Sequence, residues 1–142
     1  KQRIRIGSLI EEPGLYPGMT AAENLEVYRR AYGITDSNVI RDTLDFIGLG
    51  NTGKKKVGKF SMGMKQRLGI AIAILKSPDF LILDEPINGL DPTGIHEVRE
   101  FLIALNREKN ITIMISSHIL GGIVKDSYKL WYYPGRRTGG GV

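Results

Sequence analysis

An apolar run followed at once by two carboxylates constrains the fold of this chain more than any other feature. Phe80 to Leu83 is continuously apolar, and Asp84, Glu85 and Pro86 follow it. Because the run has no polar alternation and is bounded by charge and proline, it predicts a central strand of a parallel sheet, buried on both faces. Desolvation of two unpaired carboxylates there would be costly, so a cation or a bound water is expected beside them. The alternative is that Asp84 only caps a turn.

Strands and helices alternate along the rest of the chain. Thr20 and Glu23 form a capping box that begins one helix, and Asp91 followed by Pro92 begins another. The complete prediction has strands over 3–10, 80–83 and 111–115, and helices from Thr20, over 36–49, over 64–76 and from Asp91 onward. Polar residues follow the apolar strands, and open α/β sheets bind their ligands at the carboxyl ends of strands. The sequence therefore predicts an α/β domain with its chemistry at that edge.

Composition narrows the function classes. The chain has 142 residues, a net charge of +5, 25% charged residues and no cysteine, which excludes a disulfide scaffold and a disordered chain. No apolar run approaches the length of about 20 residues that crosses a bilayer. Two histidines, His96 and His118, are too few for a histidine metal cluster. The basic residues are spread over several segments, so nucleic acid is not an expected partner.

Two further candidate groups lie near predicted strand and helix ends. His118 follows the strand 111–115, where its imidazole could donate to a phosphate oxygen, although a lone histidine is more often structural. Ser61 and Gly63 lie at a helix start, where free backbone N–H groups and the helix dipole favour an anion. An ordinary serine N-cap is the alternative at that position.

The order of these features resembles the ATP-binding-cassette (ABC) family over residues 3–120. A loop glutamate, a serine–glycine helix start, an apolar run with Asp-Glu-Pro, a Gly-Leu-Asp turn and a strand before a histidine follow one another as in that family. The resemblance implies that Asp84 holds Mg²⁺ at the Walker B position and that Glu85 is the catalytic glutamate. It also makes Asp91 the D-loop aspartate and His118 the catalytic switch histidine that contacts the γ-phosphate.

Two loops refine the resemblance. Phe60 to Arg67 resembles the signature Leu-Ser-Gly-Gly-Gln with its trailing basic residues, and it keeps the phosphate-facing pair Ser61 and Gly63 while Met62 and Met64 replace Gly and Gln. The Q-loop position carries Glu11 where most of the family has Gln, and the resemblance makes Glu11 a contact of the nucleotide and its metal. With Leu-Tyr-Pro-Gly-Met-Thr downstream, the segment that contains this glutamate is similar to the corresponding segment of the branch that exports bacitracin and lantibiotic-type peptides.

The resemblance implies a P-loop NTPase-like ABC ATPase fold, present in part. Residues 1–125 are expected to be the carboxyl-terminal portion of the ATPase domain, with the helical signature subdomain and the Walker B and switch-histidine strands. No Gly-rich Walker A run with its Lys and Ser occurs in the sequence, so we expect a truncated or trimmed chain that does not bind Mg-ATP tightly alone. Without the upstream strand, 80–83 and 111–115 are expected to leave an unpaired edge. Residues 126–142 are an atypical tail, for which a frameshift is one hypothesis.

The resemblance also implies partners and a location. It makes the chain part of an ATP-binding subunit that couples ATP hydrolysis to export of a substrate such as an antimicrobial peptide. The expected partners are a membrane-spanning transporter subunit and a second cassette, as a homodimer or a paired ABC ATPase subunit. The expected location is cytoplasmic, peripheral at the inner face of the cell membrane.

Two alternatives to the transporter reading stay open. An ABC-type ATPase of DNA repair or chromosome organisation shares the same motifs, but such proteins insert long coiled coils where Glu11 and Ser61 are only about 50 residues apart. The other alternative is an inactive remnant that only binds partners.

Overall fold

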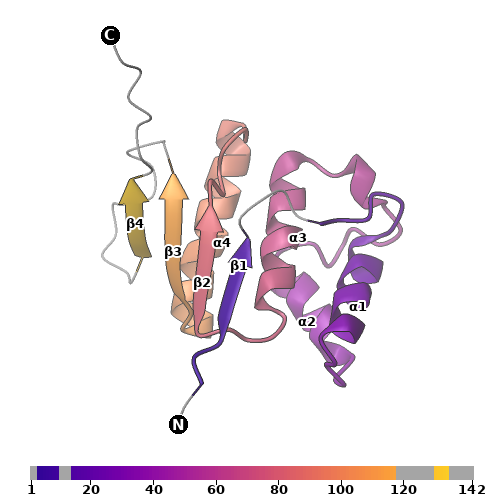
Figure 1. The fold of residues 1–142 in the computed structure, drawn as a ribbon. Helices are drawn as coiled ribbons and strands as arrows, with labels where there is room; N and C mark the ends of the chain where they lie inside the picture. Colours follow the sequence, from indigo (N-terminus) through magenta and orange to yellow (C-terminus); the bar gives the residue numbers. More distant parts are fainter. Residues whose placement is uncertain (1–2, 10–13, 118–129, 135–142) are drawn as a thin grey trace.

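The computed structural model describes residues 3–9, 14–117 and 130–134, and these confirm the α/β class. The four strands form one parallel sheet in the order β1–β2–β3–β4. In Figure 1, α4 lies behind the sheet, and α3 lies between the sheet and the pair α1 and α2. The elements are β1 (Ile6–Leu9), α1 (Ala21–Ala31), α2 (Asn38–Phe46), a 3-10 turn (Val57–Lys59), α3 (Met62–Ile74), β2 (Phe80–Asp84), α4 (Pro92–Lys109), β3 (Thr112–Ser117) and β4 (Leu130–Pro134).

The strand β2 is central, as predicted, but only one of its faces is fully buried. Leu81 and Leu83 have no exposed surface, whereas Phe80 and Ile82 are half-buried. Leu81 lies opposite Ile113 in the register with β3, and these buried residues share one core with α3 and α4. The prediction of burial on both faces is therefore wrong for the second face, which the described helices do not cover.

The capping box at the start of α1 is confirmed. The Thr20 Oγ1 accepts from the Glu23 backbone N–H at 3.1 Å, and a Glu23 carboxylate oxygen accepts from the Thr20 N–H at 2.8 Å. These two bonds satisfy donors that the helix itself leaves unpaired. Thr20 also bridges to Lys56, so the start of α1 is tied to the turn that precedes α3.

Local chemistry explains where α3 and α4 begin and end. The helix α3 begins at Met62, two residues before the predicted start, because the Ser61 Oγ accepts from the Met64 N–H at 3.2 Å. It ends before Ser77, whose φ of 49° breaks the helix ahead of Pro78. The helix α4 begins after Asp91 as predicted and ends at Lys109, because the next residue, Asn110, is left-handed with a φ of 53°.

The sheet has more strands than the sequence predicts. The strand β3 pairs in parallel with β4, which lies in the atypical tail of residues 126–142, where the sequence predicts no strand. Leu-Trp-Tyr-Tyr in β4 is apolar and aromatic, the composition that strands favour. The prediction that 80–83 and 111–115 leave an unpaired edge is therefore wrong, because each has a strand on both sides. The division of the chain at residues 125 and 126 stays a prediction.

Backbone and side-chain bonds between Arg5 and Asp79 fix the amino ends of β1 and β2. The Arg5 N–H donates to the Asp79 carboxylate at 3.0 Å, and the Asp79 N–H donates to the Arg5 carbonyl at 2.8 Å. The Arg5 N–H, helped by the guanidinium, lowers the pKa of Asp79. Both side chains are more than half exposed, so the bonds define the register more than they stabilise the sheet.

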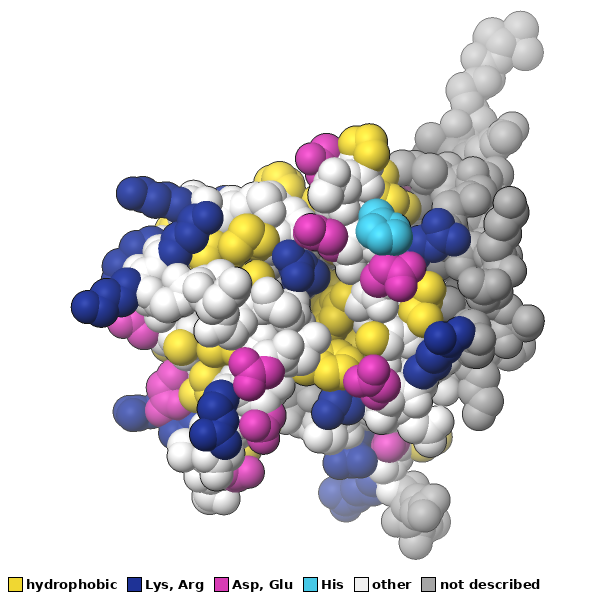
Figure 2. All heavy atoms as spheres, turned by 180° about the vertical axis from the view of Figure 1, so that it is seen from behind, with side chains coloured by type: hydrophobic (Ala, Val, Ile, Leu, Met, Phe, Trp, Pro, Cys, Tyr) yellow, Lys and Arg dark blue, Asp and Glu magenta, His cyan; other side chains and the backbone are white. Residues whose placement is uncertain are grey.

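The surface over the helices is mixed in charge. Figure 2 shows basic and acidic side chains on this face with hydrophobic side chains between them. In the described part of the chain, no helix is both long and apolar enough to span a membrane.

The capping box gives a first testable prediction. Thr20→Ala removes one bond of the capping box and is expected to lower the free energy of unfolding by about 1 kcal/mol. Chemical denaturation monitored by circular dichroism measures the change. Thr35→Ala, at an exposed threonine outside any helix or strand, is the matched control and should leave stability unchanged. Equal effects of the two substitutions would contradict the capping role.

A second prediction concerns acid stability. Hydrogen bonds from Arg29 and then Arg30 lower the pKa of Glu26 to about 2 from 4.5. A lowered pKa means that this stabilisation is present above the ordinary pKa and is lost as the pH falls from 4.5 toward 2. Glu26→Gln should therefore flatten the decline of the melting temperature over that range, whereas Glu108→Gln on the exposed side of α4 should not. Parallel pH profiles of wild type and Glu26→Gln would refute the assignment.

Candidate functional site

The strands β1, β2 and β3 end at one edge of the sheet. Leu9, the last residue of β1, lies opposite Leu83, and Asp84, the last residue of β2, lies opposite Ser116 in β3. Asp84 is exposed, so its carboxylate is accessible at this edge. The sheet therefore places Asp84 where parallel α/β sheets bind ligands.

Glu85 leaves the strand in an unusual backbone conformation. Its φ is 50°, the left-handed region that favours glycine, and its N–H donates to the Ser116 carbonyl at 2.7 Å. The residue is half-buried. A left-handed glutamate costs about 1 kcal/mol or more in backbone energy, so the pairing with β3 holds Glu85 in a position that its own preference would not select.

A tight turn carries the chain from Glu85 to α4. The Asn88 N–H donates to the Glu85 carbonyl at 3.2 Å, and Gly89 has a φ of 78°. Asp91 then caps α4, because its Oδ1 accepts from the Gly94 N–H at 2.8 Å. The predicted site residues Asp84, Glu85 and Asp91 are thus connected through one short, hydrogen-bonded segment.

The predicted anion site lies at the start of α3. Ser61 is exposed and caps the helix, while Gly63 is buried in its first turn. This end of α3 packs against the start of α4: a Cβ placed on Gly63 would lie 3.3 Å from the Cα of Gly94. The structure therefore brings Ser61 and Gly63 beside Asp91, with the positive ends of two helix dipoles next to each other.

The carboxylates of Asp84 and Glu85 suit a magnesium ion that takes most of its ligands from other molecules. No group of three Asp, Glu or His side chains converges within 3–9, 14–117 and 130–134, although Asp84 and Glu85 are adjacent. Mg²⁺ is commonly held by one or two carboxylates together with water and phosphate oxygens. Asp84 therefore fits a role as one ligand of a metal that arrives with a phosphate compound.

Two predicted site residues, Glu11 and His118, lie outside the described residues. At the junction of α3 and α4 the structure also places Gly94 and Glu97, which the sequence did not single out, and Arg67, which the sequence placed only in the signature-like segment. The Arg67 guanidinium donates to the Ile47 carbonyl at 2.9 Å and to Glu97 at 3.3 Å. A glycine three residues after a helix cap is the signal that would have pointed to this close contact.

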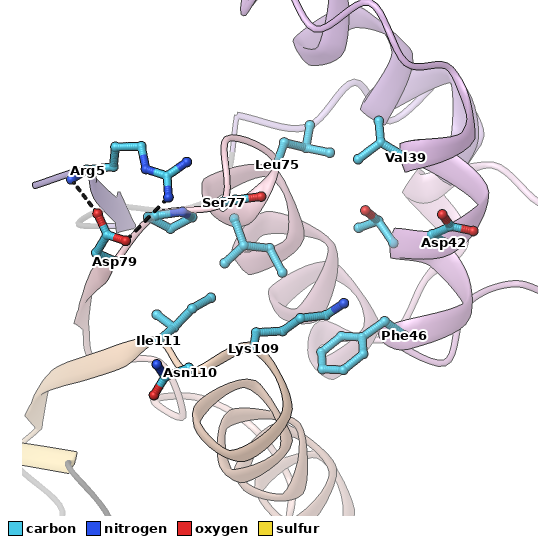
Figure 3. A pocket seen from close by; sticks show the side chains of 13 residues that line it. Arg5, Val39, Asp42, Phe46, Leu75, Ser77, Asp79, Lys109, Asn110 and Ile111 are labelled. Atoms are coloured by element: carbon cyan, nitrogen blue, oxygen red, sulfur yellow. Dashed lines mark hydrogen bonds and ion pairs between the residues drawn. The ribbon is translucent and has the colours of Figure 1, made fainter. Parts of the chain in front are cut away.

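A cavity of about 380 Å³ lies at the other end of the strands. Figure 3 shows Arg5, Asp79 and Ile111 around it, all at the amino ends of strands, and the Lys109 side chain extending toward Phe46. The Lys109 Nζ is 5.0 Å from the Phe46 ring centroid. None of the described lining residues is a predicted site residue, so this cavity is separate from the carboxylate edge.

Comparisons with known proteins indicate the family of this chain. A sequence model described as ABC transporter matches residues 1–88. Over 119 residues the chain is 56% identical to the bacitracin transport ATP-binding protein of Bacillus licheniformis and 51% identical to the lantibiotic transport ATP-binding protein of Streptococcus pyogenes. These matches cover 84% of this chain but only 39% and 51% of the two relatives, so the chain spans about two fifths to one half of their length.

Solved structures show the same architecture. An ATP-binding subunit of an ABC transporter is 34% identical with a TM-score of 0.61, over 82% of this chain and 49% of that one. An ATP-binding cassette in its ADP conformation has a TM-score of 0.70 over 82% of this chain and 52% of that one, and at 24% identity it supports the fold alone. With the family match over more than half of the residues and the carboxylate pair at the end of the central strand, this chain belongs to the ABC transporter family.

Proposed function

We propose that this chain is part of the ATP-binding subunit of an ABC transporter that couples ATP hydrolysis to export of an antimicrobial peptide of the bacitracin or lantibiotic kind. The observation that carries the proposal is the Asp84–Glu85 pair at the carboxyl end of β2, with the Glu85 backbone bonded to β3. The names of the two relatives support the cargo class. The proposed partners are a membrane-spanning subunit and a second cassette, at the inner face of the cell membrane.

Each site residue has a proposed role in ATP hydrolysis. Mg²⁺ bound at Asp84 would neutralise charge on the phosphates of ATP. Glu85 orients the attacking water and accepts its proton, a task that suits a carboxylate fixed just beyond the strand. Glu11 and His118, which follow β1 and β3 in the sequence, are proposed to contact the metal-bound nucleotide and the γ-phosphate.

The start of α3 serves the nucleotide of the second cassette. In a head-to-tail dimer, Ser61 and Gly63 of one protomer face the phosphates bound by the other. Free N–H groups in the first turn of α3 and the helix dipole favour that negative charge. Asp91, at the adjoining start of α4, lies at the same face and is proposed to contact the facing site.

Glu85→Gln tests the catalytic role. The experiment uses a completed cassette, in which an upstream segment that contains a Gly-rich Walker A run with its Lys and Ser is joined to Lys1. Glu85→Gln should abolish steady-state ATP hydrolysis and leave an ATP-bound dimer, because the phosphate contacts survive while the water is no longer activated. Phosphate release and size-exclusion chromatography with ATP measure the two effects.

Glu100→Gln, on the exposed side of α4, is the matched control for that experiment. It should hydrolyse ATP like the parent cassette. Near-parental turnover by Glu85→Gln would remove Glu85 from the mechanism. A parent cassette that neither binds nor hydrolyses Mg-ATP would overturn the proposed function itself.

The backbone strain at Glu85 gives an independent prediction. Glycine adopts a φ of 50° at no steric cost, so Glu85→Gly should raise the free energy of unfolding of this chain by about 1 kcal/mol while abolishing activity of the completed cassette. Glu100→Gly, the same substitution inside α4, should lower it by about 1 kcal/mol. Urea denaturation of both variants measures the sign of each change in the free energy of unfolding. A destabilised Glu85→Gly would show that the side chain stabilises the fold more than the strain opposes it.

A further inference from the structure

We propose that the turn over residues 54–59, called the lysine turn below, binds the anionic lipid headgroups of a membrane surface. Four of its six residues are exposed lysines, with no acidic residue among them: Lys54, Lys55, Lys56 and Lys59. The inference rests on the proposed function for the presence of a membrane beside the chain. It adds a direct contact with lipid, in addition to the contact with a membrane-spanning subunit.

The lysine turn is fixed to the body of the protein. Val57, in its middle, is 1% exposed and belongs to the hydrophobic core. The Val57 N–H donates to the Met19 carbonyl and the Gly58 N–H donates to the Pro17 carbonyl, each at 2.9 Å. The lysines on both sides of Val57 are therefore carried by a fixed backbone. Binding through them costs less chain entropy than binding through a disordered basic tail.

Most of the positive charge of the turn is unpaired. The Lys56 Nζ lies 3.9 Å from a Glu23 carboxylate oxygen, and both side chains are about half exposed. The other three lysines of the turn form no ion pair with any residue that the structure describes. Unpaired like charges gathered in a short segment create a local positive potential, which attracts an anionic surface over about a Debye length.

The turn lies at one extremity of the molecule, where a flat surface can reach it. Figure 1 places it beside the start of α1, at the end of the molecule away from β4, and the bridge between Thr20 and Lys56 agrees with this position. In Figure 2, which is seen from behind, Lys and Arg side chains gather at the upper left, on that same side. The described carboxylate edge at Asp84 belongs to the sheet and not to this end.

The type of basic residue favours lipid over a protein or a nucleic acid as the partner. Arginine is enriched in protein interfaces and lysine is depleted there, and the turn has lysine alone. Sequence-specific contacts with bases also rely most on the planar guanidinium of arginine. Lysine is a point charge on a flexible apolar stem, which suits a diffuse layer of headgroups better than a partner of fixed shape.

An exposed tyrosine next to the turn supports the same partner. Tyr16 is 46% exposed and precedes Pro17, whose carbonyl accepts from Gly58 in the turn. Tyrosine is enriched at membrane interfaces because its ring is apolar while its hydroxyl stays hydrated. Lysines beside an exposed tyrosine are thus a combination that anionic bilayers attract through both charge and apolar burial.

Flotation of this chain with lipid vesicles tests the inference. Vesicles of equal parts phosphatidylglycerol and phosphatidylcholine should bind the chain, and vesicles of phosphatidylcholine alone should not. Salt at about 1 M, which shortens the Debye length to ~3 Å, should release the bound chain. The mixture holds neither nucleotide nor a membrane subunit. A chain that does not float with the anionic vesicles would therefore overturn this inference and leave the proposed function as it stands.

A double variant tests whether the turn is the binding surface. Lys54→Gln together with Lys55→Gln should weaken binding to the anionic vesicles by about fivefold for each lysine removed. These two are chosen because Lys56 contacts Glu23 and Lys59 lies two residues before the proposed site residue Ser61. Circular dichroism of the variant checks that its fold is retained.

Lys76→Gln together with Lys109→Gln is the matched control. Both lysines are exposed, both lie outside the turn, and their loss changes the net charge by the same amount. Each lies over an aromatic ring, as Lys55 does over Phe60. The control should weaken binding by less than about twofold for the pair, because these lysines are far from the turn in the sequence and isolated from each other. Equal losses in the two double variants would show that net charge and not the turn attracts the vesicles, and would overturn the assignment.

Two soluble polyanions separate lipid from the other partner classes. A poly-glutamate peptide and a DNA duplex are offered to the chain under the same low-salt conditions. Binding to either of them without binding to the anionic vesicles would overturn the lipid assignment, in favour of an acidic protein or a nucleic acid. A completed cassette without ATPase activity would overturn the proposed function, and the flotation experiment would still decide whether the lysine turn binds lipid.

Discussion

The parallel pairing of β2 with β1 on one side and β3 on the other is the constraint on which the rest of the structure depends. It aligns the ends of three strands, so that polar residues far apart in the sequence meet at one edge. It also holds the backbone of Glu85, through the Ser116 carbonyl, in a conformation that glutamate disfavours. Hydrogen bonding within the sheet thus also orients the residue that carries this carboxylate.

The two helix starts of the proposed anion site each use a polar cap together with a small residue. Ser61 and Asp91 satisfy N–H groups of their own helices and leave the remaining first-turn donors for an anion. Placing two positive helix ends side by side is electrostatically unfavourable in the absence of a negative partner. Such an arrangement is stable enough in the folded chain because Leu68 and Val98, further along α3 and α4, are fully buried in a common core.

Much of this could be predicted from sequence because the signals are local. The capping residues Thr20 and Asp91 and the apolar strand before Asp84 each depend on neighbours within a few positions, and the structure confirms all three. The start of α3 was placed two residues late, because the signature-like segment offers no apolar period in its first turn. The partner of β3 and the contact between Gly63 and Gly94 were missed, since both depend on segments that meet only in the folded chain. The roles of Glu11 and His118 stay predictions.

The long separation in sequence between β1 and its neighbour β2 affects how the chain folds and opens. Arg5 and Asp79 are 74 residues apart, whereas β2 and β3 are joined through the single helix α4. Closing the longer loop costs more chain entropy, and contacts between distant segments slow folding. As a four-residue strand with exposed Ile6 at the end of the sheet, β1 gains little from burial once it arrives. Its backbone amides should therefore exchange with solvent through local opening well before those of β2, so that the Leu9 end of the sheet is the part of the site edge that loosens first.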